Sequence, residues 1–130
     1  MTLHIDGQRR SLLVDMNTDT GVFLFAGVSL PENTNTFFEP VIEELEDYLK
    51  SPCPHTTLNF YVEYLNTSSA LFLRRIVMMC EAHLAIDSLE VNWHYEEDDE
   101  DIYEFGLDFQ SIFKKVDVQL IAVKDNPFSS

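Results

Sequence analysis

Apolar and polar positions recur along this chain in two patterns, which together predict an ordered series of strands and helices. The runs 2–5 and 11–15 alternate weakly, and we expect them to pair as a hairpin through the turn at Asp6-Gly7. The run 21–27 is continuously apolar and of strand length, which is typical of a buried strand. The later segments with a strand pattern are 56–65, 89–95 and 116–123.

Three segments instead place apolar residues at the one-three-four spacing of an amphipathic helix: 37–49, 68–86 and 102–113. In the first, Thr36 and Glu39 have capping-box spacing. Pro40 is expected near the first turn, because a proline deeper in a helix breaks it.

Two of these patterns predict which side chains are buried. The second helix is expected to bury a stripe of Leu73, Val77, Cys80 and Leu84. The strand 56–65 is expected to place Tyr64 on the same face as Phe60, because side chains alternate along a strand.

Strands that alternate with helices favour an α/β fold with a mostly parallel sheet. At 130 residues the chain is long enough to bury a core. We therefore predict one domain over residues 1–130, with a mixed, mostly parallel sheet and about three amphipathic helices. In such sheets, sites gather where the carboxyl ends of strands meet the amino ends of helices.

The composition is ordinary for a folded protein, but the net charge of −15 is not. A surface this acidic repels phosphate backbones and anionic membranes, so we expect neither nucleic-acid binding nor membrane insertion. No apolar run approaches a membrane span, and the first residues lack a signal-peptide core, which predicts a cytoplasmic protein. The two cysteines indicate no disulfide framework.

Asn66-Thr67-Ser68-Ser69 lies between a strand pattern and a helix pattern. Such side chains cap helix starts, and the free N–H groups there favour an anion. Thr67 is therefore either a helix cap, a role that Asn66 or Ser68 could share, or a hydroxyl that carries a phosphate. Ser68 and Ser69 are alternative acceptors.

Three segments give the chain a family resemblance: Gly27–Asn33 (Gly-Val-Ser-Leu-Pro-Glu-Asn), Tyr64–Ser69 (Tyr-Leu-Asn-Thr-Ser-Ser) and Trp93–Asp101 with Glu104 and Gly106. In this order and spacing they resemble the SiaC-type bacterial regulatory phosphoproteins. The resemblance covers roughly residues 20 to 113.

The resemblance implies a small α/β fold similar to STAS domains and a partner-switching role without catalysis or a cofactor. It implies a SiaB-like serine/threonine kinase that phosphorylates Thr67 and a SiaA-like phosphatase of the PP2C type that removes the phosphate. The unmodified form would bind and activate a SiaD-like diguanylate cyclase, which raises cyclic di-GMP and promotes biofilm formation.

We call residues 66–69 the acceptor segment. The partner-binding surface is expected to combine this segment with the loop before the first helix and with part of the acidic run. Its predicted residues are Ser29, Pro31, Glu32, Asn33, Asn66, Thr67, Ser68, Ser69, Asp98 and Asp99.

The run 96–101 contains six consecutive acids and has three interpretations. It could be a solvated loop and helix start, a docking surface for a basic patch, or a site for Mg²⁺ or Ca²⁺. The metal interpretation leads to a rival function, a metal-assisted hydrolase that uses these carboxylates. A static acidic adaptor, in which Thr67 is only a cap, is the third hypothesis.

Overall fold

The computed structural model describes residues 2–113 and 116–128 as one six-stranded sheet and three helices. The strands are β1 Thr2–Ile5, β2 Leu13–Asn17, β3 Val22–Ser29, β4 His55–Leu65, β5 Ser88–Glu96 and β6 Asp117–Val123. The helices are α1 Thr34–Tyr48, α2 Thr67–Glu81 and α3 Glu100–Ile112. The order of strands and helices that the sequence predicts is confirmed.

The strands lie in the sheet in the order in which they occur in the chain, from β1 to β6. β1 pairs with β2 and β2 with β3 in antiparallel fashion, as the predicted hairpin requires. The pairs β3–β4, β4–β5 and β5–β6 are parallel. The α/β class and the mixed sheet are therefore confirmed, and parallel pairing runs from β3 to β6, the strands that the helices connect.

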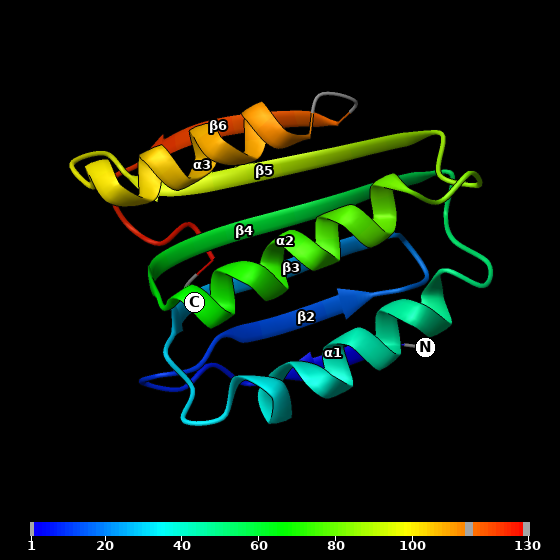
Figure 1. Cartoon of the computed structure of the whole chain (residues 1–130), viewed down its shortest axis with the longest axis horizontal. Coiled ribbons are helices and arrows are strands. Elements are labelled where there is room, and N and C mark those ends of the chain that lie inside the picture. The colour runs from blue at the N-terminus through cyan, green and yellow to red at the C-terminus, as the bar shows by residue number, and fades with distance from the viewer. Residues whose placement is uncertain (1, 114–115, 129–130) are drawn as a thin grey trace.

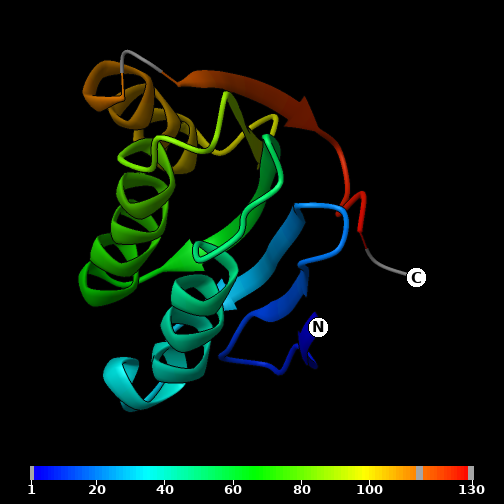
Figure 2. The same ribbon diagram turned by 90° about the vertical axis from the view of Figure 1, so that its right-hand side faces the viewer.

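All three helices cover the same face of the sheet, and α2 lies between α1 and α3 (Figures 1 and 2). This arrangement follows from the strand order. Each helix joins two adjacent parallel strands, every crossover moves in the same direction, and crossovers are almost always right-handed. The carboxyl ends of β3, β4 and β5 and the amino ends of the three helices consequently meet at one edge.

The core lies between the sheet and the helix layer. Phe60 in β4 stacks on Phe25 in β3, with ring centroids 5.3 Å apart, and also contacts Trp93 in β5. Trp93 is fully buried, and its indole N–H donates to the carbonyl of Ile102 at 2.9 Å. This bond satisfies a buried donor and fastens α3 to β5.

The prediction that Tyr64 shares a face with Phe60 is wrong, because the strand pairing shifts by one residue near the end of β4. Gly27 pairs with Val62 but Val28 pairs with Tyr64, which leaves Glu63 without a partner in β3. A bulge of this kind reverses the alternation of side chains. Tyr64 is consequently 62% exposed, and Leu65 packs against the core instead.

The predicted start of α1 is also wrong. The helix is capped by Asn33, whose side chain accepts from the N–H of Thr36 at 3.0 Å, so Thr36 and Glu39 lie within the helix. Pro40 is then the seventh helical residue rather than a first-turn residue. It deprives the Thr36 carbonyl of its helical donor. Both residues are exposed, so water can hydrate that carbonyl.

The second helix ends five residues earlier than predicted, at Glu81, and Leu84 is 98% exposed instead of buried. After α2 the chain turns back toward β5. The N–H groups of Asp87 and Ser88 both donate to the carbonyl of Pro54, at 2.8 and 3.0 Å. These bonds position the start of β5 beside β4, and a longer α2 would carry the chain away from that point.

Candidate functional site

The segment that joins β4 to α2 places Thr67 at the surface. Asn66 is the N-cap of α2, and its side-chain oxygen accepts from the N–H of Ser69 at 2.8 Å. Thr67 is the first helical residue and is exposed. The hypothesis that Thr67 itself caps the helix is therefore wrong, because Asn66 fills that role and leaves the threonine hydroxyl outside the capping bond.

The three hydroxyls of this segment differ in accessibility. Ser68 is exposed like Thr67, whereas Ser69 is fully buried. The Ser69 hydroxyl accepts from the Ser29 hydroxyl at 2.7 Å and donates to the Ser29 carbonyl at 3.1 Å. Ser69 thus helps to hold the segment in place, and only Thr67 and Ser68 present a hydroxyl to solvent.

Ser29 joins the acceptor segment to the end of β3. Its carbonyl also accepts from the backbone N–H of Asn66 at 3.1 Å, and its side chain is fully buried. Pro31, Glu32 and Asn33 follow directly and lead into α1. The loop 31–33 and the segment 66–69 therefore lie at the same edge of the sheet, and the buried hydroxyl pair between Ser29 and Ser69 connects them.

The acidic run is divided among three structural roles. Glu96 ends β5 and accepts from the Tyr61 hydroxyl at 3.1 Å. Burial raises the pKa of Tyr61 above its ordinary value, and the Glu96 carboxylate raises it further. Asp99 caps α3 by accepting from the N–H of Ile102 at 3.1 Å, and Glu100 and Asp101 lie in the first turn. Acids there complement the helix dipole.

Asp98 lies in the loop between β5 and α3 and is exposed, whereas Asp99 is half-buried. Both lie after β5, the strand next to β4, and so at the edge that also carries the acceptor segment. Within residues 2–113 and 116–128, no three or more histidine, cysteine or acidic side chains are grouped so that they could hold a metal ion.

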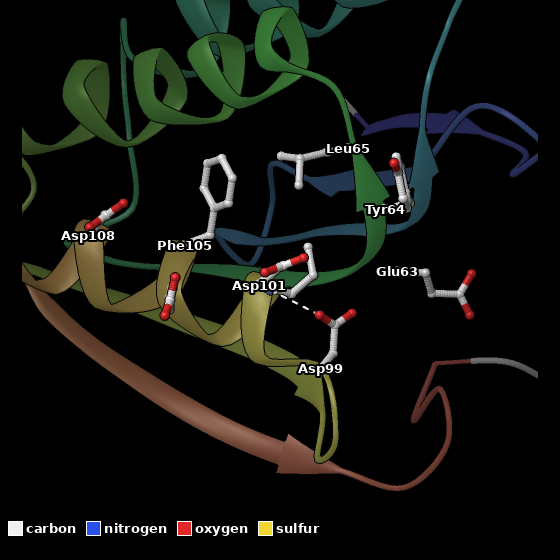
Figure 3. A pocket seen from close by; sticks show the side chains of 9 residues that line it. Glu63, Tyr64, Leu65, Asp99, Asp101, Phe105 and Asp108 are labelled. Atoms are coloured by element: carbon white, nitrogen blue, oxygen red, sulfur yellow. Dashed lines mark hydrogen bonds between the residues drawn. The ribbon is translucent and has the colours of Figure 1, made fainter.

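A pocket of about 510 Å³ lies between the end of β4 and α3 (Figure 3). Its lining combines apolar and aromatic side chains, among them Leu65 from β4 and Phe105 from α3, with acidic ones. The full set of lining residues is Glu63, Tyr64, Leu65, Asp99, Asp101, Ile102, Glu104, Phe105 and Asp108.

Of the predicted partner-binding residues, only Asp99 lines this pocket. Asp101 belongs to the acidic run, and Tyr64, Leu65 and Glu104 belong to the segments that carry the family resemblance. The available signal was the parallel order, which brings the end of β4 next to α3, together with the four-residue spacing of Glu104 and Asp108. The bulge at Glu63 hides the contribution of β4, because it turns Tyr64 outward and Leu65 inward.

The sequence model of the SiaC family regulatory phosphoproteins matches residues 5–123. The chain belongs to the SiaC family. An uncharacterised protein of Pseudomonas aeruginosa strain UCBPP-PA14 is 29% identical over 109 residues, which are 83% of this chain and 86% of that protein.

Solved structures of SiaC from Pseudomonas aeruginosa show the same arrangement. The apo-SiaC crystal structure is 26% identical, with a TM-score of 0.76 over 94% of this chain and 98% of that chain. SiaC in complex with the diguanylate cyclase SiaD, of which it is the activator, is 26% identical, with a TM-score of 0.77 over 92% and 97%.

Among the described residues, no helix is both long enough and apolar enough to cross a membrane.

Proposed function

We propose that this SiaC family protein is a non-catalytic switch whose unmodified form binds and activates a diguanylate cyclase in the cytoplasm. A serine/threonine kinase phosphorylates Thr67 and ends that interaction, and a PP2C-type phosphatase restores it. The cyclase follows from the likeness to SiaC of Pseudomonas aeruginosa, which is the activator of SiaD. The observation that carries the choice of residue is that Thr67 is exposed at the first position of α2 while Asn66 caps the helix.

The start of α2 can accept a phosphate without loss of its cap. A helix leaves its first four N–H groups without partners in the helix. Those of Asn66 and Ser69 are already bonded, to the Ser29 carbonyl and to the Asn66 side chain. The N–H groups of Thr67 and Ser68 remain for a phosphate, which the helix dipole also stabilises. Phosphorylation would therefore change the charge of this edge while the fold persists.

The buried hydroxyl of Ser69 is a poor kinase substrate, because phosphorylation there would break its bonds to Ser29. Ser29 and Ser69 thus serve to support the binding surface, and its contacts come from Asn66, Thr67, Ser68 and the loop 31–33. Ser68 is exposed and is the natural comparison for Thr67.

The test is peptide mass spectrometry on tagged protein isolated from its native host, with Thr67→Ala and Ser68→Ala variants beside the wild type. We expect a phosphate on the peptide that contains Thr67 in the wild type and in Ser68→Ala, and none in Thr67→Ala. Phosphate on Ser68 instead of Thr67 would show that the proposal names the wrong residue as the switch. The absence of any phosphate from this peptide of the wild type under several growth conditions would favour the static adaptor and contradict the proposal.

The same preparations test the output. Thr67→Ala cannot be switched off, so it should recover at least as much diguanylate cyclase as the wild type under every growth condition. Thr67→Asp should recover less, although one carboxylate carries less charge than a phosphate. Equal recovery by all three proteins would show that Thr67 does not control the interaction.

A further inference from the structure

The charge of the helix layer is unevenly distributed. The α1 helix carries the acids Glu39, Glu43, Glu44, Glu46 and Asp47, and α3 carries Glu100, Asp101, Glu104 and Asp108. The α2 helix, which lies between them, has one acid at its last residue and carries Arg74 and Arg75. It is therefore a basic strip within a helix layer that is otherwise acidic.

The exposed side of α2 is also apolar. Leu71 is 56% exposed and Met78 is 52% exposed, although α2 already buries Leu73, Ile76, Val77 and Cys80 against the core. Leu71 and Met78 are seven residues apart and so lie on one side of the helix. Ser68 and Arg75 fall on the same side, at three- and four-residue spacings from Leu71. We call Ser68, Leu71, Arg75 and Met78 the α2 outer face.

We propose that the α2 outer face extends the surface that binds the target in the unmodified state, and that it fits a partner surface with apolar side chains flanked by carboxylates. The apolar part of the partner packs on Leu71 and Met78, and its carboxylates pair with Arg75. This inference rests on the proposed function and extends its binding surface from Ser68 along the exposed side of α2.

Charge complementarity selects this occupant. The rest of the helix layer is acidic and would repel carboxylates, so an acidic partner is stabilised only over α2. Arg74 and Arg75 form no ion pair with any described residue, so their charges are available to a partner. A basic partner would instead be directed to α1 or to the pocket beside α3, where the acids lie.

The position of Thr67 gives the switch its direction. At a rise of about 1.5 Å per residue, Thr67 lies roughly 6 Å from Leu71 and 12 Å from Arg75 along the helix axis. A phosphate there adds nearly two negative charges at the end of the α2 outer face. These distances are close to the screening length of about 8 Å at physiological salt, so the phosphate repels an acidic partner and weakens its attraction to Arg75.

The experiment measures the diguanylate cyclase that co-purifies from the native host with tagged protein, in the Thr67→Ala background. This background keeps every sample unmodified, so the kinase cannot influence the result. We expect Arg75→Glu and Leu71→Ala each to reduce recovery of the cyclase by about fivefold to tenfold, as buried interface residues do. The matched controls are Glu43→Lys on α1 and Leu107→Ala on α3, which should stay within about twofold of the background protein.

Recovery that is unchanged by both α2 variants, while Thr67→Ala alone recovers cyclase, would overturn the α2 outer face and leave the proposed function intact. Loss of recovery in Glu43→Lys or Leu107→Ala, with the α2 variants unaffected, would assign docking to the acidic helices and also overturn the inference. Failure of Thr67→Ala itself to recover any cyclase would overturn the proposed function.

Discussion

Gly106 lies where α3 comes closest to the sheet. A methyl group at this position would stand 2.5 Å from Cδ2 of Leu120 and 2.6 Å from Cδ1 of Trp93. Both neighbours are held in place, since Leu120 packs against the core and the Trp93 indole is bonded to Ile102. The absence of a side chain, and not backbone freedom, is therefore what this position requires.

We expect Gly106→Ala to destabilise the protein by about 1–3 kcal/mol, because overpacking a filled core costs more than the helix gains from alanine. Urea unfolding followed by circular dichroism measures the change. Ser111→Ala is the matched control, because Ser111 is an exposed residue of the same helix and its substitution should change stability by less than about 0.5 kcal/mol. A Gly106→Ala protein as stable as the wild type would show that α3 can move away from Trp93 at little cost.

At the scale of elements, the order of strands and helices follows from periodicity, because each pattern depends on the local chain. The errors occur where a distant contact decides. The bulge at Glu63 follows from pairing with β3, and the end of α2 follows from bonds to Pro54. Pro40 is tolerated in the second turn, where both it and Thr36 are exposed residues.

The candidate site likewise has features that the sequence predicts and features that depend on distant contacts. The parallel order was enough to place the loop 31–33 and the segment 66–69 at one edge. The hydroxyl pair between Ser29 and Ser69 joins residues forty positions apart, and no local pattern indicates it. The pocket beside α3 depends on how side chains of β4 and α3 meet, and no local pattern shows that meeting.

The cap of α2 provides a test at this scale. Replacing Asn66 with alanine removes the oxygen that accepts from the Ser69 N–H, and such losses cost about 1 kcal/mol. Asn66→Asp should retain most of the stability, because aspartate caps about as well as asparagine. Urea unfolding of the three proteins checks this. If Asn66→Ala matched the wild type while Asn66→Asp lost stability, the bond to Ser69 would not be what holds the start of α2.

For the whole molecule, the dominant quantity is the charge. The chain has 23 acids and 8 lysine and arginine residues. Among the described residues, Lys50 pairs with Asp47, and His4 contacts Asp6 in a pair that is ionic only when the imidazole is protonated. The acids instead gather on α1, on α3 and around the pocket. The folded state concentrates this charge, and the repulsion is greater than in the extended chain.

Salt should therefore stabilise the protein. Raising NaCl from about 10 mM to about 0.1 M shortens the screening length from roughly 30 Å to 10 Å, which removes repulsion between helices while leaving apolar packing unchanged. We expect the midpoint of thermal unfolding to rise by about 3 °C or more, which corresponds to roughly 1 kcal/mol for a chain of this size. The matched control is a variant with Glu43, Glu46 and Glu104 replaced by glutamine, whose midpoint should be higher in low salt and should rise less with added salt. A midpoint that stays constant or falls with salt would mean that the acids are compensated within the fold, and it would remove the physical basis for treating α2 as a basic strip in a repulsive surface.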